Sequence, residues 1–315
     1  MEKLAIVAIG GNSLIADVSK LDLEHQWDAV RETARHLAQM VANGWHIVIT
    51  HGNGPQVGYA MRRAEIAQQQ GIHNPPLDSL VADTQGSIGY MIQQAMDNSL
   101  RRLGINRTCA TIVTQIRVDA DDPDFEHPSK PVGAFMTETE AMQRKEQDGW
   151  YVMNDAGRGW RRLVPSPKPR AIQEINAIQA LMLSGYVVIA GGGGGIPVIR
   201  TDVGSLRGVE AVIDKDRASS LLAQQLRADL LLISTGIEKV ALNFGHSDQH
   251  DLDTITLSQT QQYITDGQFP AGSMLPKIEA SVEFVRNGGP QAIITNPQNL
   301  TRALIGETGT RIIPS

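Results

Sequence analysis

The sequence predicts an α/β fold built on a parallel sheet with crossover helices, and three observations support this prediction. Short runs of β-branched residues at 6–9, 47–50 and 187–190 are typical of strands that are covered on both faces. Glycines follow each run, where they allow tight turns and a close approach of the main chain to a ligand. Helical patterns separate the early strands, and strands that alternate with helices form parallel sheets.

The first part of the chain alternates strand, helix, strand and helix. Residues 27–41 carry apolar side chains at helical spacing, and this helix is expected to stop before Gly44. A strand at 45–50 then leads through the loop 51–58 into a helix that extends to Gln70.

Another helix is predicted to open at residues 83–90, and a strand is predicted at 108–118. Gly86 and Gly89 stand three residues apart in this helix, which favours close packing against a neighbouring element or a subunit contact over catalysis.

The composition changes in the middle of the chain. Residues 119–131 are acidic and contain prolines, and the segment up to Arg162 is polar. Compact domains rarely contain such long irregular connections without a function for them. We therefore predict an inserted subdomain or lid at about 119–164, after which residues 165–169 return to the main body.

The second half returns to strands and helices. An amphipathic helix at 172–183 precedes the five consecutive glycines of 191–195, and a charged cluster at 208–220 marks the start of a further helix. The remaining elements are strands at 229–234, 239–244, 292–295 and 310–313, and a loop at 267–277 that leads into a helix through Val285.

Composition excludes several classes of protein. A chain of 315 residues with 41% hydrophobic content can bury a large core, and no apolar run approaches the roughly 20 residues of a membrane span. The net charge of −6 argues against a nucleic-acid partner. The start has no signal-peptide pattern, so we expect a cytoplasmic protein without a membrane partner. The single cysteine, Cys109, is expected to be a packed core thiol.

The three glycine-bearing strand ends predict an anion site. In open parallel sheets, ligands bind beyond the carboxyl ends of the strands, where helix N-termini attract phosphate. A tight strand-to-helix turn explains any one of these clusters equally well. The three clusters together, and the conformational entropy that five consecutive glycines lose on ordering, favour a site for a polyanion.

Lysines near these glycines are candidates for phosphoryl transfer, which depends on positioning and on electrostatic stabilisation. Lys215 lies between Asp214 and Asp216, which would hold it in place, and Lys277 is a second candidate. A solvated charge cluster is the alternative explanation for Lys215. The third lysine, Lys130, is on sequence grounds more often a simple loop residue.

Motifs of other enzyme classes are absent from the sequence. It contains no G-x-x-x-x-G-K-[ST] loop, no H-R-D loop and no G-x-G-x-x-G fingerprint, which argues against a Walker-type ATPase and a dinucleotide dehydrogenase. There is no G-x-S-x-G or H-E-x-x-H motif, and one cysteine makes a thiolate zinc site implausible. His51 either donates to a ligand or orients its own loop.

Seven ordered motifs, which span nearly the whole chain, resemble those of carbamate kinases in the amino acid kinase superfamily. They are residues 8–14, 51–58, 130–133, 164–167, 191–198, 208–216 and 272–277. The resemblance implies a three-layer αβα sandwich around an open, mainly parallel eight-stranded sheet with a small protruding subdomain. It also implies a homodimer and reversible phosphoryl transfer between ATP and carbamate, giving ADP and carbamoyl phosphate, used in the cell to make ATP.

The resemblance also assigns roles to residues. It implies that carbamate and the transferred phosphoryl group bind to Gly10, Gly11, Asn12, Gly52, Asn53, Gly191, Gly192 and Gly193. It implies catalytic roles for Lys130, Lys215 and Lys277, with Asp216 orienting the lysines, and a nucleotide site formed by Asp214, Ser234, Thr235, Val240, Gly272, Ser273 and Met274. No protein-bound metal is expected, because Mg²⁺ would accompany the nucleotide phosphates.

The resemblance also implies one domain with two lobes. Residues 1–185 would bind carbamate and include the lid, and residues 186–315 would bind the nucleotide. Two alternatives remain at this point: a sibling amino acid kinase that phosphorylates another small carboxylate, and a non-catalytic sensor of carbamoyl phosphate or nucleotide. Asn12, where related kinases have lysine, and the Lys130 motif argue against the first, while the retained lysines argue against the second.

Overall fold

The computed structural model describes residues 3–10, 23–155 and 159–315. Its centre is an eight-stranded sheet in which neighbouring strands are parallel except β16 and β17. In spatial order the strands are β15 (Thr254–Thr256), β17 (Thr310–Ile313), β16 (Ala292–Thr295), β12 (Leu230–Ser234), β1 (Lys3–Ile9), β2 (Trp45–His51), β9 (Val187–Ile189) and β3 (Cys109–Thr111). The predicted mainly parallel sheet is confirmed.

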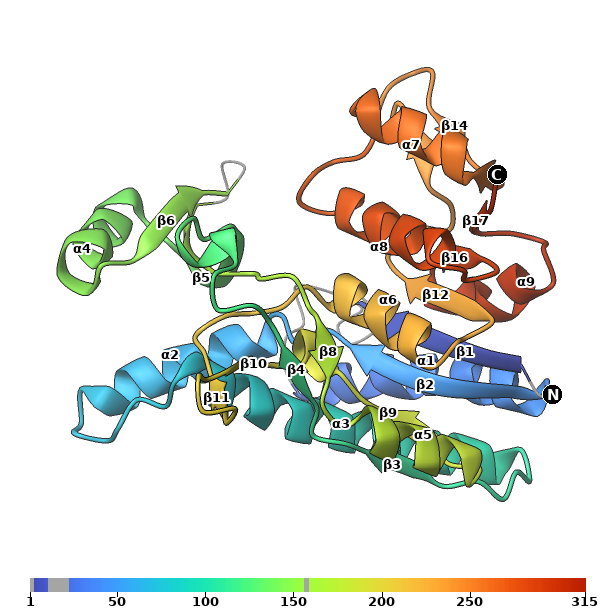
Figure 1. Cartoon of the computed structure of the whole chain (residues 1–315), viewed down its shortest axis with the longest axis horizontal. Helices are drawn as coiled ribbons and strands as arrows, with labels where there is room; N and C mark the ends of the chain where they lie inside the picture. Colours follow the sequence, from blue (N-terminus) through green and yellow to red (C-terminus); the bar gives the residue numbers. More distant parts are fainter. Residues whose placement is uncertain (1–2, 11–22, 156–158) are drawn as a thin grey trace.

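Helices cover both faces of this sheet (Figure 1). The side chains of β1 alternate between two core clusters: Leu4, Ile6 and Ala8 belong to one, and Ala5, Val7 and Ile9 belong to the other. The first cluster packs against α5 (Ile175–Leu183), α6 (Lys215–Gln225), α7 (Leu257–Thr265) and α8 (Leu275–Arg286), and the second against α1 (Leu23–Ala42), α3 (Leu77–Arg102) and α9 (Leu300–Leu304). The fold is the expected αβα sandwich.

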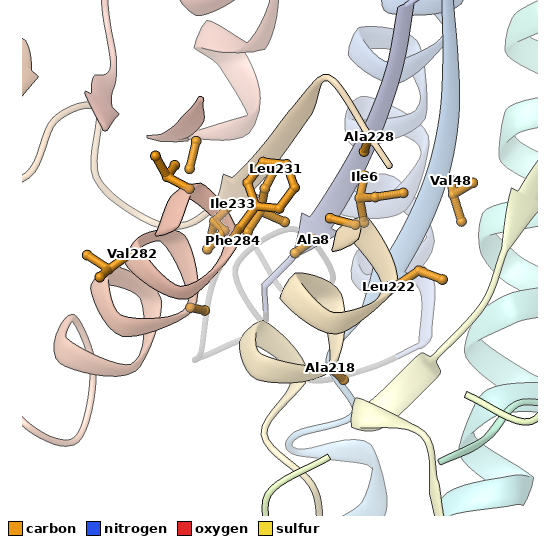
Figure 2. Close-up of a cluster of buried hydrophobic side chains, with 14 of the residues drawn as sticks. Ile6, Ala8, Val48, Ala218, Leu222, Ala228, Leu231, Ile233, Val282 and Phe284 are labelled. Atoms are coloured by element: carbon orange, nitrogen blue, oxygen red, sulfur yellow. The ribbon is translucent and has the colours of Figure 1, made fainter. Parts of the chain in front are cut away.

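The core positions α6 directly against the central strands. Figure 2 shows α6, which carries Ala218 and Leu222, beside β1, which carries Ile6, and Phe284 of α8 close to Ile233 of β12. These side chains are at most 2% exposed. Burying a large apolar side chain contributes about 1.5–3 kcal/mol, so this packing fixes the helix whose first turn carries Lys215.

A smaller four-stranded sheet flanks the main one and contains β11 (Leu206–Gly208), β10 (Ile196–Arg200), β4 (Gln115–Arg117) and β8 (Ala171–Ile172). Strands β9 and β10 pair with strands that precede residue 185, and β11 pairs with β10. The sheets therefore associate residues 187–208 with the first half of the chain, whereas the two-lobe division assigned them to the second.

The predicted protruding subdomain is present (Figure 1). It consists of β5 (Lys130–Met136), β7 (Trp160–Val164), β6 (Tyr151–Asn154) and α4 (Glu138–Asp148). Its base is anchored by Val132 and Val164, which join a third apolar cluster with Val57 and Met61 of α2 (Gln56–Gln68). The outer part of the subdomain, including α4, extends away from this base.

Several element boundaries differ from the predictions. Residues 108–118 form two strands of different sheets, β3 and β4, because the chain leaves the main sheet at Ile112–Thr114 to bond with α3 and the pentaglycine segment. Residues 239–244 contribute only β13 (Ala241–Leu242), which pairs with β14 (His250–Asp251) outside the main sheet, while β15 was not predicted. The third helix begins at Leu77 instead of residue 83, and residues 171–172 form β8 before α5 starts.

Among residues 3–10, 23–155 and 159–315, the short 3₁₀ turns are η2 (Pro123–Phe125), η3 (Gly192–Gly194) and η4 (Pro297–Asn299). Cys109 is buried at the start of β3, as expected for a core thiol, and burial raises its pKa well above the ordinary value. Within the described ranges, no helix combines the length and the apolar character that crossing a bilayer requires.

Candidate active site

The first turn of α6 is held by Asp214. This residue is the N-cap, and its Oδ1 accepts hydrogen bonds from the main-chain N–H groups of Asp216 (2.9 Å) and Arg217 (3.2 Å). Such a cap satisfies two of the four N–H groups that a helix leaves without partners at its start. The cap therefore fixes where the side chain of Lys215 leaves the helix.

Asp216 joins two of the predicted lysines. Its Oδ1 lies 2.5 Å from Nζ of Lys215, and its Oδ2 lies 3.2 Å from Nζ of Lys277 on α8. Lys277 also donates to the carbonyl of Ser273 at 3.2 Å. Asp216 is 2% exposed, and the two ammonium groups offset the cost of burying a carboxylate there. Asp216 therefore contacts both of the lysines that the family resemblance implied it would orient.

Lys130 reaches the same cluster from the base of the protruding subdomain. Its Nζ donates to Oδ2 of Asp214 at 3.1 Å. Burial by itself would raise the pKa of Asp214, but the ammonium groups of Lys130 and Lys215 outweigh this effect and hold that pKa well below its usual range. The structure therefore assigns Lys130 a specific ion pair, whereas the sequence had favoured a simple loop residue.

The cluster has an excess of positive charge and spare donors. Three ammonium groups face two carboxylates, Asp214 and Asp216, which leaves one net positive charge. Each ammonium group has three N–H donors. In the described part of the chain, Lys130 and Lys215 each donate to one acceptor and Lys277 to two. An anion that enters the cluster therefore meets several donors that have no protein acceptor.

The carboxyl ends of the strands converge on these lysines. Some main-chain N–H groups at these strand ends already have an acceptor in the sheet. Gly10 N–H donates to the Ser234 carbonyl and Gly52 N–H to the Ile9 carbonyl, both at 3.1 Å, and these bonds continue the sheet. A Cβ on Gly52 would lie 3.5 Å from Cδ of Lys215, so the loop after β2 touches the lysine stem. In this arrangement the N–H groups of Gly10 and Gly52 are therefore already used within the sheet. Gly11 and Asn12 lie outside the described residues.

The pentaglycine segment is explained mainly by close packing. A Cβ would lie 2.3 Å from Nε2 of His51 at Gly192 and 2.5 Å from Nδ2 of Asn53 at Gly193. At Gly194 and Gly195 it would lie 2.1 Å from the Ile213 carbonyl oxygen and 2.4 Å from Cγ1 of Ile116, and φ is positive at both. Real side chains cannot fit at such distances. Close packing therefore explains these glycines without a phosphate-binding loop, although the N–H groups of Gly192 and Gly193 have no acceptor among the described residues.

Gln85 on α3 clamps this segment and was not singled out from the sequence. Its Nε2 donates to the carbonyls of Gly192 (2.9 Å) and Thr114 (3.1 Å), and its Oε1 accepts from Thr114 N–H (2.8 Å). Thr114 Oγ1 in turn accepts from Gly191 N–H at 2.9 Å, so this donor is also used. The available signal was a glutamine at a buried position of an amphipathic helix, where an amide is found only with partners.

His51 and Asn53 support the loop after β2. Asn53 donates through Nδ2 to Thr84 Oγ1 on α3 at 3.2 Å. His51 Nδ1 lies 2.9 Å from the Gly52 carbonyl, so in the neutral ring this nitrogen carries the proton. Burial lowers the pKa of His51 from 6.5 to about 4, a shift that the Gly52 hydrogen bond opposes and the nearby Lys215 ammonium reinforces. His51 is thus a neutral, loop-orienting residue at neutral pH.

A buried hydroxyl pair, also missed from the sequence, links β2 to α6. Thr50 Oγ1 and Ser219 Oγ are 2.6 Å apart, and the Ser219 hydroxyl also lies 2.6 Å from the Lys215 carbonyl. This chain of hydrogen bonds ties the first turn of α6 to the end of the neighbouring strand. Ser219 is one of the small residues in the charged motif, so its spacing from Lys215, one helical turn, was the signal available.

The predicted nucleotide residues fall into three groups. Ser234, at the end of β12, and Thr235, whose N–H donates to the Thr295 carbonyl at 2.8 Å, lie at the sheet edge beside Gly10. Val240 is 1% exposed and belongs to the core, with its N–H bonded to Thr310, so it does not form a solvent-facing wall. The exposed Gly272 and Ser273 and the half-buried Met274 precede α8 and lie next to Lys277 in the chain.

Comparisons with known proteins agree with this architecture. The family profile described as "Amino acid kinase family" matches residues 3–296. The chain is 51% identical over 315 residues to the carbamate kinase-like protein YahI of Escherichia coli, with 99% of both chains covered. It is 44% identical to the carbamate kinase of Pyrococcus horikoshii, with both chains fully covered.

Solved structures lead to the same family. The structure of carbamate kinase from Giardia lamblia bound to AMP-PNP is 40% identical, with a TM-score of 0.92 and 99% of each chain covered. A protein from Aeropyrum pernix has a TM-score of 0.94 at 39% identity. The two match the whole sheet and the subdomain, since 99% of this chain is covered in each case. The chain therefore belongs to the amino acid kinase family.

Proposed function

We propose that this protein is a carbamate kinase, which transfers a phosphoryl group reversibly between ATP and carbamate. The observation that carries the proposal is the cluster in which Asp216 holds Lys215 and Lys277 while Lys130 approaches from the protruding subdomain. The full-length similarity to proteins named carbamate kinase supports this choice of substrate. The finding of a cluster with spare donors supports a role for all three lysines.

In the proposed reaction, a carbamate oxygen forms a bond to the γ-phosphorus of ATP while the bond from that phosphorus to the β,γ-bridging oxygen breaks. The products are carbamoyl phosphate and ADP, and the reverse direction makes ATP. Negative charge spreads over the transferred oxygens in the transition state, and preorganised ammonium groups stabilise it. Lys215 and Lys277 would supply two of these groups from fixed helices.

Mg²⁺ is proposed to bind through the nucleotide phosphates. The described residues contain no group of three or more His, Cys, Asp or Glu side chains that could hold a metal ion. Asp214 and Asp216 are already bonded to lysines. Phosphate oxygens and water are ligands that Mg²⁺ accepts readily, and the ion would neutralise part of the phosphate charge.

We further propose that the glycines that follow β1, β2 and β9 border the carbamate and the phosphoryl group. Ser234, Thr235 and the segment 272–274 would border the nucleotide. The protein would act as a cytoplasmic homodimer and make ATP from carbamoyl phosphate in catabolism. The division into a carbamate lobe and a nucleotide lobe remains part of this proposal.

The direct test mixes the purified protein with ADP, Mg²⁺ and carbamoyl phosphate and measures ATP by coupled luminescence. We expect ATP at a rate proportional to protein concentration, above a control without protein. A panel with acetyl phosphate and N-acetylglutamyl phosphate in place of carbamoyl phosphate separates this activity from that of a sibling kinase. No ATP from any donor, together with tight binding of carbamoyl phosphate, would instead indicate the sensor.

A further inference from the structure

The two oxygens of Asp214 have different partners. Oδ1 caps α6 through the N–H groups of Asp216 and Arg217, and Oδ2 accepts from the ammonium group of Lys130 at 3.1 Å. One carboxylate therefore connects the protruding subdomain to the helix that carries Lys215. The side chains of Lys130 and Asp214 are 27% and 21% exposed, so this ion pair is shielded from most of the solvent.

The backbones on both sides of this ion pair are anchored in one apolar cluster. Val132 lies two residues after Lys130, Val212 lies two residues before Asp214, and both are buried in the cluster that includes Val57 and Met61. Lys130 also pairs with Val164 in the β5–β7 ladder. The base of the subdomain is thus fixed, and the remaining freedom of Lys130 lies in its flexible side chain.

The capping role alone does not require a charge at residue 214. Asparagine and aspartate are about equally good N-caps, because each offers an oxygen to the helix N–H groups. The charge matters for Lys130, since a flexible lysine side chain loses conformational entropy when it is held in one place. A hydrogen bond between charged groups is stronger than one between neutral groups and offsets that cost.

From this geometry, and resting on the function proposed above, we propose that Asp214 is the positioning residue for Lys130. Its Oδ2 holds the ammonium group beside the first turn of α6 before substrate binds, leaving two N–H donors of Lys130 for the transferred phosphoryl group. This role differs from the nucleotide contact that the family resemblance implied for Asp214. It also explains how a lysine outside the main body can be preorganised for the reaction.

A double-mutant cycle tests this role. We expect Asp214→Asn, which keeps the cap, to lower kcat for ATP formation by about tenfold while leaving the KM for ADP within about twofold. In a Lys130→Ala background, the same change should alter kcat by less than about twofold, because the lysine it acts on is missing. The matched control is Glu210→Gln, which removes a carboxylate 3.5 Å from Arg162 of the same subdomain but outside the site, and which should retain wild-type kcat.

Nuclear magnetic resonance of the lysine side chains in the ligand-free protein provides a readout that does not depend on activity. The Cε resonance of Lys130, assigned as the one that Lys130→Ala removes, should show a lower order parameter in Asp214→Asn than in the wild type, because the ammonium group has lost its partner. Equal losses of kcat in both backgrounds, an equal loss in Glu210→Gln, or an unchanged order parameter of Lys130 in Asp214→Asn would each overturn the positioning role. If the wild type makes no ATP, the proposed function fails, and the resonance experiment still decides whether Asp214 holds Lys130.

Discussion

At the scale of single residues, the site depends on charges that are useful only in combination. Asp216 is buried between Lys215 and Lys277, and each lysine is oriented by an oxygen of the same carboxylate. Removing one partner leaves the others with an unbalanced charge in a poorly solvated position. The sequence identified these residues by their motif, while their pairing depends on how α8 packs beside α6.

The replacement Lys215→Ala tests the role of a single preorganised charge. We expect turnover in the ATP-forming direction to fall by about 10² or more, because the ammonium group stabilises charge that develops on the transferred oxygens. Lys145→Ala, which changes an exposed lysine on α4, is the control and should retain wild-type turnover. Full activity of Lys215→Ala in the luminescence assay would remove this lysine from the mechanism.

At the scale of elements, the glycine segments act mainly through shape. The five glycines after β9 let the main chain pass between His51, Asn53, Ile116 and the chain at Ile213, where no side chain fits. Gly89 serves α3 in the same way, because a Cβ there would lie 2.4 Å from Cγ2 of Thr111 on β3. The sequence had favoured close packing against a neighbouring element or a subunit contact, and at Gly89 the neighbouring element is β3.

A pair of substitutions separates steric fit from backbone conformation. Gly194 and Gly204 have φ values of 89° and 82°, but only Gly194 would place a Cβ against another residue. We expect Gly204→Ala to lower the free energy of unfolding by about 1 kcal/mol through strain alone, and Gly194→Ala by about 3 kcal/mol or more through strain and overpacking. Urea unfolding measures both. Equal losses would show that the contact with Ile213 does not matter.

A second pair tests the two glycines of α3. Gly86→Ala is expected to raise the free energy of unfolding by about 0.5–1 kcal/mol, because no atom lies within 4 Å of the new Cβ and alanine is the better helix former. Gly89→Ala is expected to lower it by about 1–3 kcal/mol, because Thr111 must move. Thermal and urea unfolding of the two variants check these signs. Stabilisation by both changes would contradict the packing of α3 against β3.

At the scale of the whole molecule, the parallel sheet brings distant segments together. The carboxyl ends of β1, β2 and β12 are adjacent through the pairs Ile9 with His51 and Ile9 with Ser234. Helix α6 lies over these strands, and the protruding subdomain supplies Lys130 from its anchored base. Stability and the site are therefore coupled, since the buried titratable group of His51 ends β2 and lies near the ammonium group of Lys215.

This coupling predicts how stability depends on pH. Burial holds the pKa of His51 at about 4 in the folded state, against 6.5 for an ordinary histidine. Between these pH values, His51 binds a proton in the unfolded chain but stays neutral in the folded chain. The free energy of unfolding therefore falls as pH decreases from about 6.5 to about 4. The contribution of this group amounts to about 3 kcal/mol and is fully present above pH 6.5.

Urea unfolding at several pH values between 7.5 and 4.5 measures this dependence, and His51→Gln serves as the comparison. The variant should show a smaller slope, with a residual part from His36, whose pKa is also lowered by burial. Asp214 adds a further loss only below its ordinary carboxyl pKa, because its folded pKa is depressed. An identical slope in wild type and His51→Gln would show that His51 does not remain neutral in the fold.

How far the sequence alone could lead is clearest in particular residues. The buried β-branched strands, the alternation with helices and the insertion near 119–164 were readable because they are local patterns of hydrophobicity and composition. The lysines of the site were found through their motifs. Thr108 to Val118 looked like one strand, however, because a local pattern contains no information about the sheet that each half joins.

By itself, the sequence determined the class of fold, the motifs that identify the family and the residue types that suit phosphoryl transfer. Only the tertiary structure decided that Asp216 bridges Lys215 and Lys277 and that Asp214 binds Lys130. It also decided that the pentaglycine segment packs too closely against its neighbours for side chains to fit. The physical reason is that ion pairs and steric fit depend on distances of a few ångströms between segments far apart in the chain. Those distances are set by the packing of the helices and the subdomain on the sheet.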